Sequence, residues 1–328
     1  MAPGFRAFMS GLIDYAGLFP PAKLPLDPAI RNYVRYRTEP EAWMLGRFIC
    51  PAARLGELRA YQGDLFRQGP PFAFSVLGRG GETPAEFLAG LDADLAAIAA
   101  FRQTHGERVT AEVLEVRLPA AEVELRDADA VRGLLNDVAA RVEAAGPPRL
   151  ALFFEAPLGT EWRDVIGGTV RGIADYNATS TPARVRCGPA GFKLRCGGVD
   201  ASAFPSAEQV AFALTACRDA GIALKATAGL HHPIRRFDGG VQSMMHGFFN
   251  VFGAGMLAHA HGLDESAVRA ILEDESAESF SFKGDTFSWK GMSVSRDEIE
   301  RARAAAVTTF GSCSFDEPRE DLKALRLL

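Results

Sequence analysis

Two lysines occupy the middle of short apolar segments that each end in glycine. Lys193 lies in GFKLRCGG, residues 191–198, and Lys225 lies in ALKATAGL, residues 223–230. Burying an ammonium group costs several kcal/mol unless the group is paired or loses its proton. A neutral lysine amine attacks carbonyl groups to form a Schiff base, although its ordinary pKa is about 10.4. Burial and a second nearby ammonium both lower that pKa, so the pair predicts that Lys193 is a nucleophile and that Lys225 keeps it deprotonated.

Carboxylates stand in several of the other apolar segments and could move protons for such a lysine. Asp14 lies in LIDY, Glu115 in VLEVRL and Glu155 in LFFEAPL. Alternate residues of a strand point to the same face, so these acids are expected on the face that carries the lysines. The same alternation places Arg195 and Thr227 there. The predicted cluster suits proton transfer to a carbinolamine and to the carbon next to an imine.

An ion-paired network is the alternative use of these charges. Lys193 would then pair with Glu155, and Lys225 with Glu115, so that the lysines only hold the strands together. The residues themselves leave both interpretations open.

The elements that must position these residues alternate between β-rich and helical patterns. Predicted strands cover residues 9–13, 44–49, 72–77, 110–118, 150–154, 191–194, 223–226 and 307–310. Predicted helices cover residues 28–37, 53–66, 84–103, 128–145, 161–177 and 206–220. Eight such strands indicate an α/β fold, a (β/α)8 TIM barrel that forms a single domain over residues 1–328. No GxGxxG motif follows the first strand, which argues against a dinucleotide-binding sheet.

Residues 230–306 form an insertion between the seventh and eighth strands. Helices are predicted over 242–259, 265–273 and 296–305, with a β-hairpin in SFSFKGDTFSWKG that turns at residues 283–285. Active sites of such barrels lie at the carboxyl ends of the strands, where this segment follows the seventh strand. We expect it to be a lid or an oligomerisation surface, the latter making the protein a homo-oligomer.

The amino-acid composition restricts the classes of molecule that the protein is expected to bind. The chain has 328 residues, 48% of them hydrophobic, and a net charge of −5, which gives no reason to expect nucleic acid or an anionic membrane as a partner. Its five cysteines are irregularly spaced and form no CxxC pair, which is typical of a reducing compartment. No run of 18 apolar residues occurs. These features predict a soluble cytoplasmic protein that acts on a small molecule.

The order of these motifs resembles that of the class I deoxyribose-phosphate aldolase superfamily, the DeoC-like barrels. The family patterns IDHTLLKP, CVNPxxVPLA, VIGFPxGxTPxE and EVDMV are similar to LIDYAGLFPPAKLPLDPAI, FICPAARLGEL, SVLGRGGETPAE and VLEVRL here. The later patterns ILETxLL, KTSTG, KASGGI and IGTSS are similar to LFFEAPL, KLRCG, KATAGL and FGSCS. The similarity covers nearly the whole chain except the insertion, and it implies a divergent member of that superfamily.

This resemblance implies roles for individual residues. Lys193 falls on the Schiff-base position, Lys225 on the position that tunes it, and Glu115 on the proton-shuttling acid. Asp14 matches the aspartate of the first strand. The phosphate-binding end of the family is matched by Gly229, Gly311 and Ser312. The reaction it implies is aldol cleavage without a cofactor.

Two departures from the family pattern change the expected substrate. Arg195 and Cys196 replace small hydroxyl residues, and LHHPIRR follows Gly229 with no counterpart in the family. An inward Arg195, together with Arg235 or Arg236, would bind a carboxylate or phosphate by bidentate pairing. The sequence therefore predicts a carbon–carbon lyase that acts on a small aldehyde or keto substrate with an anionic group. Glu155 and Thr227 are further candidates for substrate contact.

Histidines support a second class of function. His231 and His232 are adjacent, and with His246 they raise the question of a metal site, but no HxH or HExxH motif is present. We expect His231 and His232 to contact the substrate and no metal to bind. The alternatives are a metal-assisted hydrolase or isomerase that uses His231, His232, Glu155 and Asp14, and a non-catalytic ligand-binding barrel.

Overall fold

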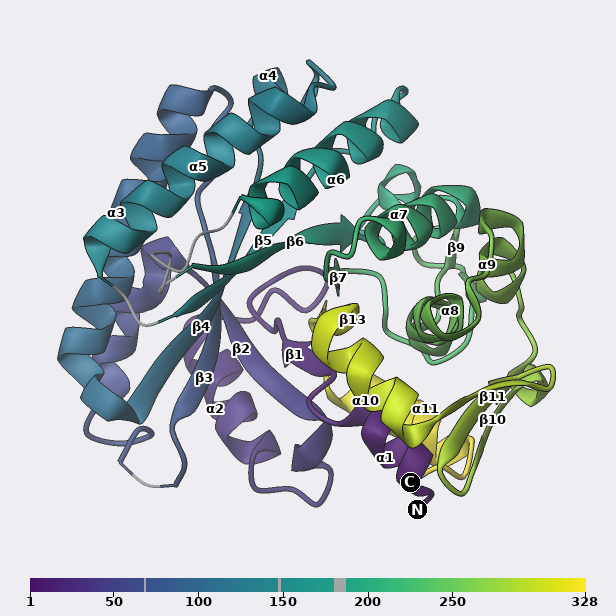
Figure 1. The fold of residues 1–328 in the computed structure, drawn as a ribbon. Coiled ribbons are helices and arrows are strands. Elements are labelled where there is room, and N and C mark those ends of the chain that lie inside the picture. The colour runs from purple at the N-terminus through teal and green to yellow at the C-terminus, as the bar shows by residue number, and fades with distance from the viewer. Residues whose placement is uncertain (68, 147–148, 180–186) are drawn as a thin grey trace. The chain divides into compact units, whose positions relative to one another are not determined.

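The computed structural model describes residues 1–67, 69–146, 149–179 and 187–328 (Figure 1). The barrel strands among them are β1 (Ile13–Tyr15), β2 (Leu45–Pro51), β3 (Phe72–Leu77), β4 (Val109–Arg117), β5 (Leu150–Glu155), β6 (Cys187–Arg195), β7 (Leu224–Thr227) and β13 (Val307–Ser312). Within the described residues these eight strands close into a barrel in the order β1-β13-β7-β6-β5-β4-β3-β2. The predicted α/β barrel is confirmed.

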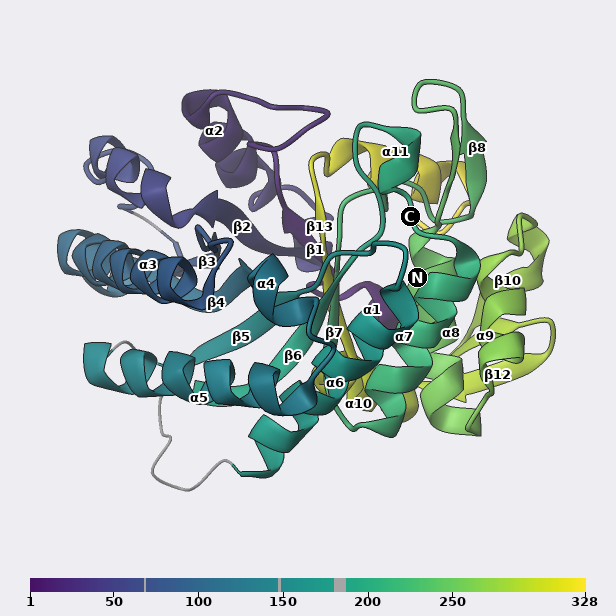
Figure 2. The ribbon, with the colours of Figure 1, turned by 90° about the horizontal axis from the view of Figure 1, so that it is seen from above.

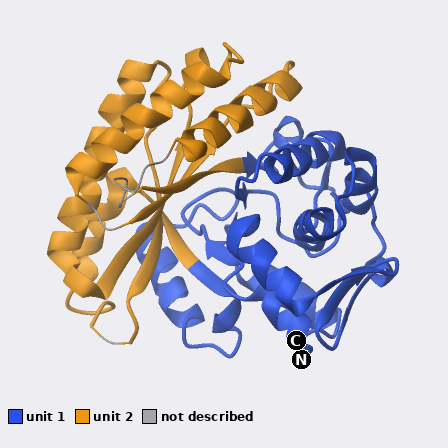
Figure 3. Cartoon of the chain, viewed as in Figure 1, with its two compact units in different colours: residues 1–46, 194–328 blue, residues 47–193 orange. Residues whose placement is uncertain are grey.

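Two compact units make up the chain (Figure 3). Unit 1 contains Met1–Gly46 and Leu194–Leu328, and unit 2 contains Arg47–Lys193. The prediction of one domain over the whole chain stays a prediction.

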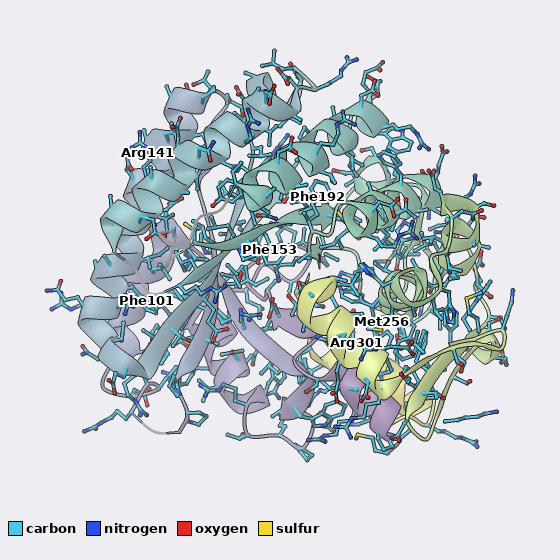
Figure 4. All side chains as sticks on the ribbon, viewed as in Figure 1. Phe101, Arg141, Phe153, Phe192, Met256 and Arg301 are labelled. Atoms are coloured by element: carbon cyan, nitrogen blue, oxygen red, sulfur yellow. The ribbon has the colours of Figure 1, made fainter. Side chains whose placement is uncertain are left out.

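Unit 2 carries long helices beside β3, β4 and β5 (Figures 1 and 2). Its helical elements are η2 (Ala52–Tyr61), α3 (Pro84–His105), η3 (Gly106–Arg108), α4 (Ala120–Val123), α5 (Ala128–Ala145) and α6 (Trp162–Ala178). The ring of Phe101 on α3 packs edge-on against Phe74 of β3, with the ring centroids 5.0 Å apart. Figure 4 labels Phe101, together with Phe153 of β5 and Phe192 of β6, among the side chains of this unit. These three aromatic side chains are buried in the apolar core of the unit.

Local signals explain where the helices of unit 2 begin and end. The Thr83 side chain accepts a hydrogen bond from the backbone N–H of Glu86 and forms a capping box that starts α3. Gly146, in the left-handed region, ends α5. The predicted helix at 53–66 is instead the 3-10 element η2, which ends at Tyr61. Gly56 and Gly63 interrupt the helical pattern there, and glycine is a weak helix former.

Unit 1 begins with a helix where the sequence analysis expected a strand. Helix α1 (Pro3–Met9) precedes β1, so the strand predicted at 9–13 is wrong in most of its length. Pro3 suits the first turn of a helix, and the buried Phe5 and Phe8 have helical spacing. The remaining helical elements before the insertion are α2 (Leu26–Tyr36), η1 (Ala42–Met44), η4 (Ala201–Ala203) and α7 (Ala207–Asp219).

The insertion between β7 and β13 contains helices and strands, as predicted. Its elements are β8 (Arg236–Asp238), β9 (Ser243–Met245), α8 (Phe248–His261), α9 (Glu265–Leu272), η5 (Ala277–Ser279), β10 (Phe280–Lys283), β11 (Thr286–Trp289), β12 (Met292–Ser295) and α10 (Arg296–Ala305). The predicted hairpin is β10–β11, which a third strand, β12, extends into an antiparallel sheet. Residues 243–245, predicted as helix, pair with β8 instead. After β13 the chain ends in α11 (Asp316–Ala324).

Helix α8 is a core helix of unit 1. Every residue from Phe248 to Ala258 is buried. The ring of Phe249 contacts Phe8 of α1 at 5.5 Å and Phe282 of β10 at 5.1 Å between centroids. The apolar side chains of α8 are therefore used in packing within unit 1. None of the helices in the described part of the chain is long and apolar enough to cross a bilayer.

Candidate active site

Lys193 lies between two carboxylates inside unit 2. Its Nζ atom is 3.0 Å from Glu115 Oε2 and 3.1 Å from Glu155 Oε2. All three side chains are buried, and Lys193 is only 3% exposed. The three residues come from neighbouring strands, β6, β4 and β5, so the predicted convergence of this lysine with these two acids is observed. We call Lys193, Glu115, Glu155 and Ser75 the lysine–glutamate cluster.

Strand alternation and register produce this arrangement. Phe192 and Leu194 flank Lys193 and are buried in the apolar core, so the lysine projects from the other face of β6. Glu155 is the direct register partner of Lys193 across the β5–β6 ladder. Neighbouring strands lie about 4.8 Å apart, a spacing that a glutamate and a lysine side chain bridge easily.

Ser75 orients one of the two acids. Its Oγ donates a hydrogen bond of 2.5 Å to Glu115 Oε1, while Glu115 Oε2 faces Lys193. The bond assigns different partners to the two carboxylate oxygens and fixes the side chain toward the amine. The sequence analysis missed Ser75, although a serine inside the apolar strand FAFSVL is a signal that could have identified it.

The protonation of Lys193 differs from the expectation. Burial by itself lowers the pKa of this amine, but the charges of Glu115 and Glu155 and their hydrogen bonds outweigh burial and raise the pKa above its ordinary value. The prediction that Lys193 is a neutral amine at pH 7 is therefore wrong for this state of the protein. The predicted ion pair between Lys193 and Glu155 is observed.

Lys225 has its own buried partners inside unit 1. Its Nζ forms a close ion pair with Asp14 Oδ2 and donates a 2.8 Å hydrogen bond to Thr309 Oγ1. The Thr309 hydroxyl donates in turn to Asp14 Oδ2 at 2.9 Å. Gly46 leaves room for the acid, since a Cβ atom there would lie 2.3 Å from Asp14 Oδ1. We call Lys225, Asp14 and Thr309 the lysine–aspartate cluster; Thr309 was not among the predicted residues.

The other predicted substrate contacts of unit 1 lie at the carboxyl ends of its strands. Thr227 accepts a backbone hydrogen bond from Cys196, and its register partner on β13 is Gly311. Gly229 needs its positive φ of 70° and the absence of a side chain, because a Cβ atom would lie 2.6 Å from the carbonyl oxygen of Cys196. Ser312 donates to the Ser314 carbonyl at 2.7 Å. These residues build the rim of the strand ends.

Arg195 ends β6 at an exposed position. Its Nη1 lies 3.5 Å from the carbonyl oxygen of Gly197. The predicted contact of Arg195 with an anionic group of the substrate stays a prediction.

His231 and His232 are each held by an acid of α11. His231 Nδ1 lies 3.1 Å from Glu317 Oε2, and His232 Nδ1 lies 2.6 Å from Asp321 Oδ2. Neither Glu317 nor Asp321 was predicted, because nothing in the sequence links a loop after β7 to a helix more than 80 residues later. His246 is buried and bound through Nε2 to the Pro205 carbonyl at 2.8 Å.

The described residues contain no group of three His, Cys, Asp or Glu side chains placed to hold a metal ion. The hydrolase alternative would require His231, His232, Glu155 and Asp14 to act together. In the structure each of these four side chains is bound to another residue: the two histidines to acids of α11, and the two acids to lysines. Nothing in this geometry favours the metal-assisted alternative.

His231 should make stability depend on pH. Burial alone would lower its pKa, but hydrogen bonds and charges from Cys313 and Glu317 raise that pKa to about 9. An ordinary histidine in the unfolded chain has a pKa of about 6.5. The stabilisation from the His231–Glu317 pair is therefore complete below pH ~6.5 and is lost as pH rises through about 9.

Urea unfolding of the wild type and of His231→Asn between pH 6 and pH 10 checks this expectation. The wild type should exceed His231→Asn in free energy of unfolding by the largest amount at pH 6. This difference should disappear above pH 9. In Glu317→Gln the same pH dependence should be weaker. A difference that grows with pH would contradict the assignment.

The fold and the buried charges define the class of protein. The chain is a parallel eight-stranded α/β barrel, a fold that is commonly enzymatic, with a charged cluster in the interior of each unit. No protein-family model matches the chain, and no curated protein matches it either.

Proposed function

We propose that this barrel is a Schiff-base lyase that cleaves or forms a carbon–carbon bond in a small aldehyde or keto compound with an anionic group. The observation that carries the proposal is a buried lysine whose amine is within hydrogen-bond distance of two carboxylates on neighbouring strands. Imine formation requires a nucleophilic amine and groups that transfer protons, and these three residues supply both on neighbouring strands. The resemblance to class I deoxyribose-phosphate aldolases supports the same assignment.

The raised pKa of Lys193 requires a proton transfer at the start of the reaction. In the proposed cycle the ammonium passes a proton to Glu155, whose Oε2 is 3.1 Å away, when a substrate enters the site. The neutral amine then attacks the carbonyl carbon and a C–N bond forms, while the carbonyl oxygen takes the proton that the attacking nitrogen loses, relayed by Glu115 at 3.0 Å. The protonated carboxyl returns a proton to this hydroxyl, which leaves as water and gives the iminium.

Cleavage and release use the same acids. The iminium accepts the electron pair of the breaking carbon–carbon bond and becomes an enamine, while a carboxylate takes the proton of the substrate hydroxyl. Reprotonation of the enamine carbon and addition of water then free Lys193. Glu115, oriented by Ser75, and Glu155 are the proton carriers in these steps.

The remaining predicted residues have supporting roles in the proposal. Arg195, which follows Lys193 by two residues along the chain, is the proposed anchor for the anionic end of the substrate, and Gly229, Gly311 and Ser312 stay predicted substrate contacts of unit 1. The tuning role of Lys225 stays what the resemblance assigns to it; within unit 1 this lysine is bound to Asp14.

Reductive trapping tests this proposal. The full chain is incubated with glyoxylate, pyruvate, acetaldehyde or glyceraldehyde 3-phosphate, reduced with borohydride, and analysed by peptide mass spectrometry. We expect a reduced adduct on Lys193 with at least one of these compounds, formed faster than any adduct on the exposed Lys323. An adduct confined to surface lysines, or none on Lys193 with all four compounds, would refute the proposal.

A non-catalytic ligand-binding barrel is the second candidate. The observation that favours it is the ion-paired state of Lys193, since a lysine held between two acids also stabilises a barrel without reacting. Under this alternative Lys193→Met would bind an anionic ligand as the wild type does, and borohydride would trap no adduct.

A further inference from the structure

Arg117 ends strand β4, two residues after Glu115 of the lysine–glutamate cluster. Val116 between them is buried in the apolar core, so both charged side chains project from the opposite face of the strand. This is the face on which Glu115 meets Lys193. Arg117 is the register partner of Glu155 on β5, and Glu155 is in turn the register partner of Lys193 on β6. The arginine therefore stands in one row with the cluster, inside the same unit.

The backbone around Arg117 is held by the strands on both sides. Toward β5, the N–H of Leu118 donates a hydrogen bond of 2.9 Å to the Glu155 carbonyl. Toward β3, the N–H of Gly78 donates a hydrogen bond of 2.8 Å to the Glu115 carbonyl. Arg117 is thus carried by a rigid element at the carboxyl end of a barrel strand, where the active sites of such barrels lie.

The guanidinium of Arg117 is exposed, and it forms no hydrogen bond or ion pair with any residue that the structure describes. Several other arginines of unit 2 are paired with acids: Arg79 with Asp94, Arg126 with Glu161, Arg132 with Asp129 and Arg141 with Asp92. An unpaired guanidinium on a fixed strand end can bind a carboxylate through two parallel hydrogen bonds.

The lysine–glutamate cluster requires a further cation if its substrate is an anion. With Lys193 protonated and Glu115 and Glu155 ionised, the three side chains carry one positive and two negative charges, a net charge of −1. Like charges repel, and they do so most strongly in a buried site of low dielectric constant. The positive charge of Arg117, in the same row of residues, offsets this repulsion.

We propose that Arg117 binds the carboxylate of a 2-oxo acid whose carbonyl carbon reacts with Lys193, an inference that rests on the proposed lyase function. Successive residues on one face of a strand are about 6.6 Å apart at Cα, and an arginine holds a carboxylate oxygen at about 2.8 Å. Glu115, the preceding residue on this face, reaches Lys193 Nζ at 3.0 Å. The spacing therefore suits a carboxylate attached to the carbonyl carbon itself better than a phosphate several atoms away.

Trapping at a series of pyruvate concentrations tests this proposal. The full chain and its Arg117→Met variant are incubated with pyruvate or with pyruvamide, its uncharged analogue, and the adduct on Lys193 is quantified after borohydride reduction. In Arg117→Met the half-saturating concentration of pyruvate should rise at least about tenfold, because a charge-assisted contact is lost. The value for pyruvamide should stay within about twofold, and the yield of adduct at saturation should not change.

Three further variants control this comparison. Arg132→Met removes a partly exposed arginine of unit 2 that is bound to Asp129, and it should change neither value by more than about twofold. Arg117→Lys keeps the charge but loses the bidentate geometry, so its value for pyruvate should lie between those of the wild type and Arg117→Met. Arg117→Gln should reproduce the effect of methionine if that variant is poorly folded. Equal half-saturation by pyruvate in the wild type and Arg117→Met, or an equal rise for pyruvamide, overturns the proposal.

Calorimetric titration with oxamate separates this inference from the lyase reaction. Oxamate carries the same carboxylate, but its amide carbonyl forms no imine with a lysine. We expect it to bind the wild type at least about tenfold more tightly than Arg117→Met. Such a difference without any adduct on Lys193 would refute the lyase function and support the carboxylate contact of Arg117. An adduct on Lys193 together with equal oxamate affinity in the two proteins, or no binding of oxamate to the wild type, would overturn the contact.

Discussion

Replacing Lys225 by methionine is expected to destabilise the folded protein by about 3–5 kcal/mol. The side chain of Lys225 is 1% exposed, and that of its partner Asp14 is fully buried. Removal of the ammonium leaves the Asp14 carboxylate buried without the opposite charge that offsets its desolvation. A loss of this size is a large fraction of the 5–15 kcal/mol by which ordinary domains are stable.

Urea unfolding at pH 7 measures this effect, and two variants control it. Asp14→Asn combined with Lys225→Met removes both charges and should recover at least half of the lost free energy of unfolding. Lys323→Met removes a lysine that is 56% exposed and lies 3.7 Å from Glu41, so it should cost no more than about 1 kcal/mol. If Lys225→Met and Lys323→Met destabilised equally, the buried ion pair would not stabilise the unit as described.

Replacing Lys193 by methionine is expected to abolish the borohydride-trapped adduct and any carbon–carbon cleavage. No other residue can supply the C–N bond in the proposed cycle, so the loss should be complete within detection. Glu155→Gln keeps the nucleophile but removes a proton carrier, and a proton carrier contributes about 10²–10⁴-fold to a rate. Arg195→Met should weaken binding of anionic carbonyl compounds more than that of acetaldehyde.

The pH profile of adduct formation carries a second signature of the lysine–glutamate cluster. The pKa of Lys193 is raised by Glu115 and Glu155 against the opposing effect of burial, so trapping by the wild type should still increase above neutral pH. In Glu155→Gln one of the raising charges is gone, and the profile should move toward acid while its maximum falls. A profile that is flat above pH 7 in the wild type, or one that moves toward alkali in Glu155→Gln, would contradict the described electrostatics.

Much of the barrel could be predicted because its strands carry local signals. Six of the predicted strands differ from the observed ones by a few residues at most, since apolar β-rich runs bounded by helices are distinctive. Alternation along GFKLR also predicted correctly that Lys193 would lie on the same face as Glu115 and Glu155. These inferences depend only on neighbours in sequence and on the period of a strand.

Features that depend on distant contacts were not predictable in the same way. The protonation of Lys193 depends on two acids at 3.0 and 3.1 Å, and their closeness is a result of register that a single sequence does not show. His231 and Glu317 are joined only because the loop after β7 meets α11. In α1, the apolar residues are compatible with a strand by composition; Pro3 suits a helix start, and packing of Phe5 and Phe8 against β10 and β11 adds contacts that the sequence does not show.

The close approach of Gly46 to Asp14 is expected to couple the evolution of these two positions. Any side chain at residue 46 would collide with the Asp14 carboxylate. We therefore expect substitutions of Gly46 and Asp14 to be correlated. Loss of the aspartate would remove the nearest of these contacts and leave the carbonyl oxygens of Gly11 and Ile13 at 3.2 and 3.3 Å, whereas a side chain gained at position 46 would favour loss of the acid and then of its lysine. Covariation among residues 14, 46 and 225 in related chains would therefore be the evolutionary trace of this one contact.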